Sequence, residues 1–138
     1  MKIVIKELDK PDSENYEIIV GWFCQAFGLG SENDYSIEAK ILESLAKAAY
    51  NNNKGMTSME IKKELGDDIG RTTIIYHLNK FIQSGLVVKR GRKYYLRSSS
   101  MYKAIEELEY DLDKEMKKML DVAKEFDKMM SSKSLSNE

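Results

Sequence analysis

Basic side chains are concentrated in one short stretch of this 138-residue chain, between Arg71 and Arg97. The stretch holds seven basic residues and no Asp or Glu, although 33% of all residues are charged and the net charge is −1. Such a distribution is typical of a surface that neutralises phosphate groups. The alternative is that a short basic run is only a solvated face. The residues are Arg71, Lys80, Lys89, Arg90, Arg92, Lys93 and Arg97.

The first half of this stretch has the spacing of an amphipathic helix, ended by Gly85. Its apolar stripe consists of Ile74, Leu78, Phe81 and Ile82. Its other face presents Arg71, Thr72, Thr73, Ile75, Tyr76, Asn79 and Lys80, which are residue types that can enter a DNA major groove. We expect the residues nearest to base edges to be Thr72, Thr73, Ile75 and Tyr76. Arg71 and Lys80 are expected to lie more on the DNA backbone.

The second half of the stretch predicts a β-hairpin with a charged tip. Two β-prone runs, LVVKR and KYYLR, flank Gly91, which permits a tight turn. The tip residues Lys89, Arg90, Arg92 and Lys93 can reach an adjacent minor groove or its flanking phosphates. The alternative is an exposed hairpin that its charges merely keep soluble.

Two other residues could carry chemistry, and both are better explained by packing. His77 lies at the border of the apolar stripe, and its helix has no Cys, Asp or second His that could share a metal. Cys24 is the only cysteine and lies among aromatic residues, where a thiol is usually inert. With no nucleophile beside a base, the sequence predicts neither an enzyme nor a metal site or cofactor.

Local signals also predict the elements before the basic stretch. We expect a short strand over residues 1–8 and a short buried helix that begins near Tyr16 and ends at Gly28 or Gly30. Ser36 is placed to cap a helix from Ile37. The run Thr57-Ser58-Met59-Glu60 matches the capping box and predicts a helix to about Leu65, followed by the turn GDDIG.

The end of the chain predicts one long helix from Met101 to about Met130, because it has no Gly or Pro and its apolar residues repeat every seven positions. About 30 residues span about 45 Å, which exceeds the width of a small domain. We therefore expect part of the stripe to need an outside partner. The expected dimerisation residues are Met101, Ile105, Leu108, Leu112, Met116, Met119, Val122 and Phe126. The polar tail, 132–138, is expected to be disordered.

The ordered elements resemble the winged helix-turn-helix transcription regulators of the ArsR-like class, especially their archaeal members. The resemblance covers about residues 37–97 and consists of the motifs His77-Leu78-Asn79-Lys80-Phe81, Gly85-Leu86-Val87 and Gly91-Arg92-Lys93-Tyr94-Tyr95. It implies a mainly α fold with a small β-hairpin wing and a long C-terminal dimerisation helix. The expected parts are an extension (1–35), the DNA-binding domain (36–98), the dimerisation helix (101–131) and the tail. Metal-sensing members carry cysteines or histidines at positions where this chain has none.

These observations lead to an expected homodimer that binds a pseudo-palindromic operator in double-stranded DNA. A cytoplasmic location fits, because no apolar run approaches a membrane span and no secretory signal is recognisable. The alternative is a winged-helix interaction module of a multi-subunit complex. A weaker idea is an effector site around Trp22 and Phe23, whose simpler interpretation is packing.

Overall fold

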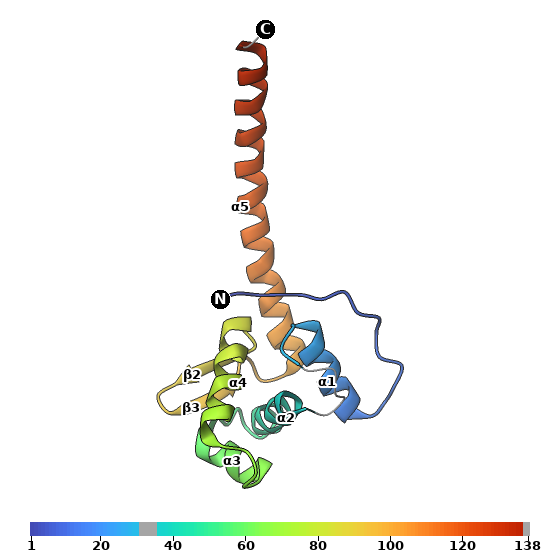
Figure 1. Ribbon diagram of the computed structural model, residues 1–138, viewed down its shortest axis with the longest axis vertical. Coiled ribbons are helices and arrows are strands. Elements are labelled where there is room, and N and C mark those ends of the chain that lie inside the picture. Colours follow the sequence, from blue (N-terminus) through green and yellow to red (C-terminus); the bar gives the residue numbers. More distant parts are fainter. Residues whose placement is uncertain (31–35, 137–138) are drawn as a thin grey trace. The chain divides into compact units, whose positions relative to one another are not determined.

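The computed structural model describes residues 1–30 and 36–136, and divides into two compact units, Met1–Ala104 and Ile105–Glu138 (Figure 1). It is mainly helical, with a small antiparallel sheet and a long C-terminal helix, as the sequence predicted. None of the described helices is long and apolar enough to cross a membrane. The elements are α1 (Tyr16–Ala26), α2 (Ile37–Tyr50), β1 (Met56–Thr57), α3 (Ser58–Leu65), α4 (Arg71–Ser84), β2 (Val87–Arg90), β3 (Lys93–Leu96) and α5 (Met101–Ser136).

Short-range hydrogen bonds fix where the helices of the first unit begin and end. The Ser36 side chain accepts a hydrogen bond from the amide of Ala39 at the start of α2. The predicted capping box opens α3, because Thr57 Oγ1 accepts from the Glu60 amide and Glu60 Oε1 accepts from the Thr57 amide, each at 3.1 Å. Gly85 ends α4 in the left-handed conformation at φ 89°, where a side chain would be strained. These boundaries confirm the sequence signals.

The sheet contains one strand that the sequence did not reveal. The predicted hairpin of β2 and β3 turns at Gly91, with Arg90 opposite Lys93. The additional strand, β1, pairs with β3 on the other side and gives the order β1-β3-β2. Because α3 begins directly after β1, this pairing ties the start of α3 to the hairpin.

The core of the first unit is formed by α2, α3 and α4 together with the start of β2. The predicted stripe of α4 is confirmed for Ile74, Leu78 and Phe81, which are fully buried, whereas Ile82 is only half-buried. The other fully buried side chains with no exposed surface are Ala39, Ile41, Leu42, Leu45, Ile61, Leu86 and Ala104. Burial of this stripe therefore fixes which face of α4 turns outward.

The expected strand over residues 1–8 is not formed. This segment has no regular secondary structure, and its amides at Lys2 and Lys6 donate to the carbonyls of Gln83 and Ala26, both at 2.7 Å. Those carbonyls lie in the last turns of α4 and α1, where a helix leaves acceptors unused. The alternating pattern thus belongs to a segment without regular structure, whose amides form hydrogen bonds with helix ends and not with a neighbouring strand. Residues 31–35 of the expected extension lie outside the described residues.

Helix α5 continues beyond its expected end. It runs to Ser136, so residues 132–136 are helical where a disordered tail was expected, and 137–138 lie outside the described residues. The polar residues after Met130 include no Gly or Pro, so nothing in the backbone stops the helix there.

Candidate nucleic-acid interface

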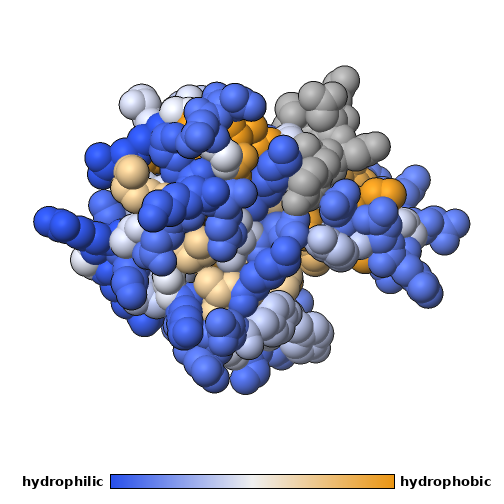
Figure 2. Space-filling model, turned by 90° about the horizontal axis from the view of Figure 1, so that it is seen from below, coloured by the Kyte–Doolittle hydropathy of each residue, from blue (hydrophilic) through white to orange (hydrophobic). Residues whose placement is uncertain are grey.

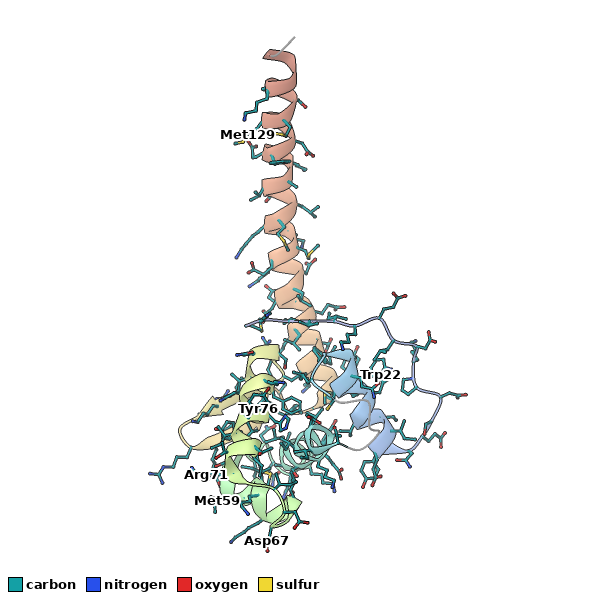
Figure 3. All side chains as sticks on the ribbon, in the orientation of Figure 1. Trp22, Met59, Asp67, Arg71, Tyr76 and Met129 are labelled. Carbon is teal, nitrogen blue, oxygen red and sulfur yellow. The ribbon has the colours of Figure 1, made fainter. Side chains whose placement is uncertain are left out.

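A groove of about 710 Å³ lies between the start of α3, the outer face of α4 and the β2–β3 hairpin. We call it the basic groove, since three of its lining side chains are cationic and none is acidic. Figure 3 labels two of its residues, Met59 and Arg71, which are near each other where α3 and α4 meet. The lining residues are Thr57, Ser58, Met59, Arg71, Ile75, Asn79, Lys89, Arg92 and Tyr94.

The α4 wall of the basic groove follows from helical spacing. Arg71, Ile75 and Asn79 are four residues apart and therefore lie on one side of the helix. Lys89 on β2 and Arg92 in the turn supply the charges of the opposite wall. The structure thus brings together five of the residues that the sequence proposed for DNA contact, from α4 and from the hairpin that follows it.

The Arg71 guanidinium is held by a hydrogen bond from its Nε to Ser58 Oγ, at 3.2 Å. Ser58 is only 7% exposed, so its hydroxyl belongs to the packed start of α3. Within residues 1–30 and 36–136 no carboxylate pairs with Arg71, whose charge is thus available to an anion. Sequence reasoning missed Ser58, because the capping box already explained the residues around it.

The remaining candidates on α4 lie outside the basic groove. Thr72, Thr73 and Tyr76 are exposed and form a separate outward surface of the helix, which we call the crest. Lys80 lies beside it, with its Nζ 4.6 Å from the centre of the Tyr76 ring. This cation–π contact restrains both side chains. The predicted contact residues on α4 are therefore divided between a groove and a crest.

The hairpin cations rest on aromatic rings of the sheet. Lys89 Nζ lies 5.3 Å from the centre of the Tyr94 ring, and the Arg90 guanidinium lies 5.5 Å from that of Tyr95. Ring faces attract cations, so these two side chains lose less freedom on binding an anion than free ones would. Arg90, Arg92 and Lys93 are all exposed.

The carboxylate of Glu60 lies near these cations in space, although Glu60 precedes the basic stretch 71–97 in the sequence. Hydrogen bonds from Thr57, aided by the charges of Lys93 and Lys63, lower the pKa of Glu60. Glu60 is thus ionised, and its carboxylate accepts the hydrogen bond from the Thr57 amide within the capping box. Glu60 does not line the basic groove, and Figure 2 shows mostly hydrophilic side chains on the face seen from below.

His77 and Cys24 lie away from the basic groove, in the packed interior of the first unit. His77 Nδ1 lies 3.4 Å from Glu38 Oε1 on α2, and within the described residues this buried nitrogen has no hydrogen-bond partner. Cys24 is 1% exposed, and its burial, aided by the charge of Glu38, raises the pKa of its thiol to about 12. Both residues thus have the packing environment that the sequence indicated. In the described part of the chain, no cluster of three His, Cys, Asp or Glu residues could hold a metal ion.

Trp22 fastens the N-terminal segment to α1. Its Nε1 donates to the carbonyl of Asp9 at 2.7 Å, and its ring meets that of Phe23 edge to face at 5.3 Å. These contacts agree with the packing interpretation of the aromatic residues.

Helix α5 begins in the first unit and forms the second unit from Ile105 onward, and its apolar row is only partly exposed. Leu108 is 2% exposed, and Met101, Ile105 and Leu112 are half-buried. From Met116 onward the stripe is open to solvent, and Figure 3 labels Met129 on it. The strongly exposed apolar residues of the stripe are Met116, Met119, Val122, Phe126, Met129 and Met130, with exposed fractions between 42% and 67%. Leu108 is thus buried in the single chain, whereas the residues of the stripe from Met116 onward are exposed.

Three ion pairs lie along the exposed surface of α5. Ion pairs link Lys117 to Asp113 at 3.0 Å, Lys118 to Glu115 at 3.0 Å, and Lys128 to Glu125 at 3.4 Å. All six residues are exposed, so these pairs contribute little individually. The apolar stripe from Met116 to Met130 is exposed on the same helix. Comparisons of the chain with protein-family models, curated proteins and solved structures found no match.

Proposed function

We propose that this protein is a sequence-specific transcriptional regulator that binds double-stranded DNA through an ArsR-like winged helix-turn-helix and acts as a homodimer in the cytoplasm. In this proposal α3 and α4 are the helix-turn-helix, and β2–β3 is the wing. The observation that carries it is the basic groove, where Arg71, Lys89 and Arg92 converge beside an exposed polar helix face. A protein surface gathers uncompensated cations around a groove when its ligand is a polyanion.

The two surfaces of α4 suit the two tasks of such a protein. The crest carries Thr72, Thr73 and Tyr76, which can contact thymine methyls, base edges and phosphates in a major groove. Its exposure matters, because a helix must project from its domain to reach the floor of a groove roughly 8.5 Å deep. The basic groove lies between this helix and the wing, where a sugar–phosphate strand would run. Base contacts then give specificity, and phosphate contacts give affinity and position.

The wing adds contacts beyond those of α4. Arg90, Arg92 and Lys93 are exposed at its tip, where the turn at Gly91 brings them close together. Arginine side chains suit a narrow minor groove, whose negative potential attracts them. The wing therefore contacts the minor groove, or the phosphates beside it, next to the major groove read by α4.

Dimerisation is supported by the stripe of α5. Its exposed residues from Met116 to Met130 repeat at the spacing of a coiled coil, and three ion pairs lie elsewhere on the helix surface. A second copy would cover this stripe. Two α4 helices would then enter successive major grooves about 34–36 Å apart, on a pseudo-palindromic operator.

Selection of bound sequences from a random duplex pool tests this proposal. The expected result is a symmetric motif with two half-sites about 10 base pairs apart. If each protomer neutralises at least three phosphates, the slope of log K against log salt should be about −5 or steeper for the dimer. Binding that selects no motif and is insensitive to salt would refute DNA recognition.

A second candidate is an interaction module that binds another protein through the same exposed stripe of α5. In that case the purified chain should stay monomeric at micromolar concentration and should show no salt-dependent duplex binding. The basic groove argues against this function, because a helix-binding module needs no groove of cations on a different unit.

A further inference from the structure

We propose that the basic groove holds the phosphate backbone of one DNA strand, and that Ser58 is the residue that positions Arg71 to clamp a phosphate there. This inference rests on the proposed function and assigns a role to a residue outside the basic stretch. Ser58 does not contact DNA itself. It acts by holding Arg71 and is therefore a positioning residue. The clamped group is a non-bridging pair of phosphate oxygens.

The hydrogen bond between Ser58 and Arg71 restricts how the guanidinium can bind. Because Nε donates to Ser58 Oγ at 3.2 Å, the N–H groups left for a ligand are those of the two terminal nitrogens. These two nitrogens form a fork that matches two oxygens of one phosphate. An arginine that is already held also loses less side-chain entropy on binding than a free one.

The anchor itself is rigid, which is what a positioning residue requires. Ser58 is 7% exposed and begins α3, directly after the capping threonine Thr57. The strand that contains Thr57 pairs with Lys93 of the hairpin. The hydroxyl that holds Arg71 is therefore fixed relative to both walls of the basic groove, so one phosphate can meet cations from α4 and from the hairpin together.

Phosphate explains the lining of the groove better than a base edge does. The groove is lined by cations from α4 and from the hairpin. The hydroxyl residues Thr57 and Ser58 line it at the start of α3, and no acidic residue lines it. A base edge in the major groove is a neutral pattern of donors and acceptors that needs a matched partner at each position. Three converging cations instead fit a strand with a charge on every nucleotide.

A double-mutant cycle on a duplex chosen from the selected pool tests the role of Ser58. S58A should weaken binding by about 2- to 10-fold for each protomer, the usual range for one net hydrogen bond. R71A should weaken all sequences alike and reduce the salt slope by about 1 for each protomer. In the R71A background, S58A should change affinity by less than about 1.5-fold, because Ser58 acts only through Arg71.

Two variants separate positioning from folding. S58T keeps the hydroxyl and should restore binding to within about twofold of the original chain. S44A removes another buried serine hydroxyl, from a residue on α2 that is 7% exposed and lies outside the basic groove, and should leave DNA affinity unchanged. Thermal unfolding of each variant, measured without DNA, shows whether a loss of affinity follows a loss of fold.

A neutral phosphate identifies the clamped group. Single methylphosphonate substitutions along the duplex should reveal one position per half-site that weakens binding of the original chain but not of R71A. The inference is overturned if S58A costs the same in both backgrounds, or if R71A changes the preferred base at one position while the salt slope stays constant. The inference also fails if the chain binds no duplex. That outcome would already appear in the selection from the random pool, and it would refute the proposed function as well.

Discussion

Replacing Phe126 by Ala should weaken the proposed dimer without unfolding the monomer. Phe126 is 57% exposed in the single chain. Taking about 200 Å² for the side chain gives about 115 Å² that a partner could cover, or about 3 kcal/mol per copy at about 25 cal/mol/Å². A two-stranded contact leaves part of each ring in water, so about half of the total of both copies, about 3 kcal/mol, is a reasonable expectation. That corresponds to a dimer dissociation constant about 150-fold weaker.

Sedimentation equilibrium over a concentration series measures this change directly. The matched control is Y110A, since Tyr110 is also an exposed aromatic residue of α5, at 62%, but lies about 160° around the helix from Phe126 at 3.6 residues per turn. We expect Y110A to dimerise like the original chain. Circular dichroism should show the same thermal unfolding for the monomeric forms of both variants. An unchanged dissociation constant for F126A would refute the assignment of this stripe to the dimer.

Three further substitutions or treatments test local features. T57A removes the capping box of α3 and should lower the free energy of unfolding by about 1 kcal/mol in urea titrations; no change would contradict the role of the box. The lowered pKa of Glu60 means that its contribution to stability is present above the ordinary value of 4.5 and is lost as the pH falls through the lower folded value. Acid titration of stability should therefore be flatter for E60Q, and identical curves would exclude this linkage. Because burial raises the pKa of the Cys24 thiol to about 12, from 9.0, Cys24 should react with Ellman's reagent at pH 8 much more slowly than a free thiol, until denaturant exposes it. Rapid labelling of the native chain would contradict its burial.

Signals that act over a few residues were sufficient to predict most of the helices. The capping box at Thr57 and the left-handed Gly85 each satisfy backbone groups within one turn, so their sequence patterns have one main structural outcome. The stripe of α4 was also predictable, because a 3.6-residue period with large apolar side chains has only one face to bury.

Features that depend on distant partners were not predictable in the same way. The two-residue strand β1 exists because β3 offers it a free edge, and two residues carry no period of their own. The reverse error occurred at residues 1–8, where an alternating pattern predicted a strand but the amides bond to helix ends. Ser58 and Arg71 are 13 residues apart, and only the packing of α3 on α4 brings them together.

The heptad pattern of α5 predicted a long helix with an exposed apolar stripe. It did not predict where the helix ends or which residues of the stripe are exposed. Leu108 fits the repeat as well as Phe126 does, yet it is buried, since the repeat records apolar positions and not what covers them. The helical end at Ser136 was missed for a related reason: serine and lysine are common in tails, but neither stops a helix.

The division of α4 into a groove side and a crest makes affinity and specificity separable by mutation. The spacing of Arg71, Ile75 and Asn79 directs one row into the basic groove, whereas Thr72 and Tyr76 point to the crest. Both rows are held by the same buried stripe, so a change on one side need not move the other. If the groove binds phosphates and the crest reads bases, groove variants should lower affinity for every duplex and flatten its salt dependence, while crest variants should change which sequences are preferred.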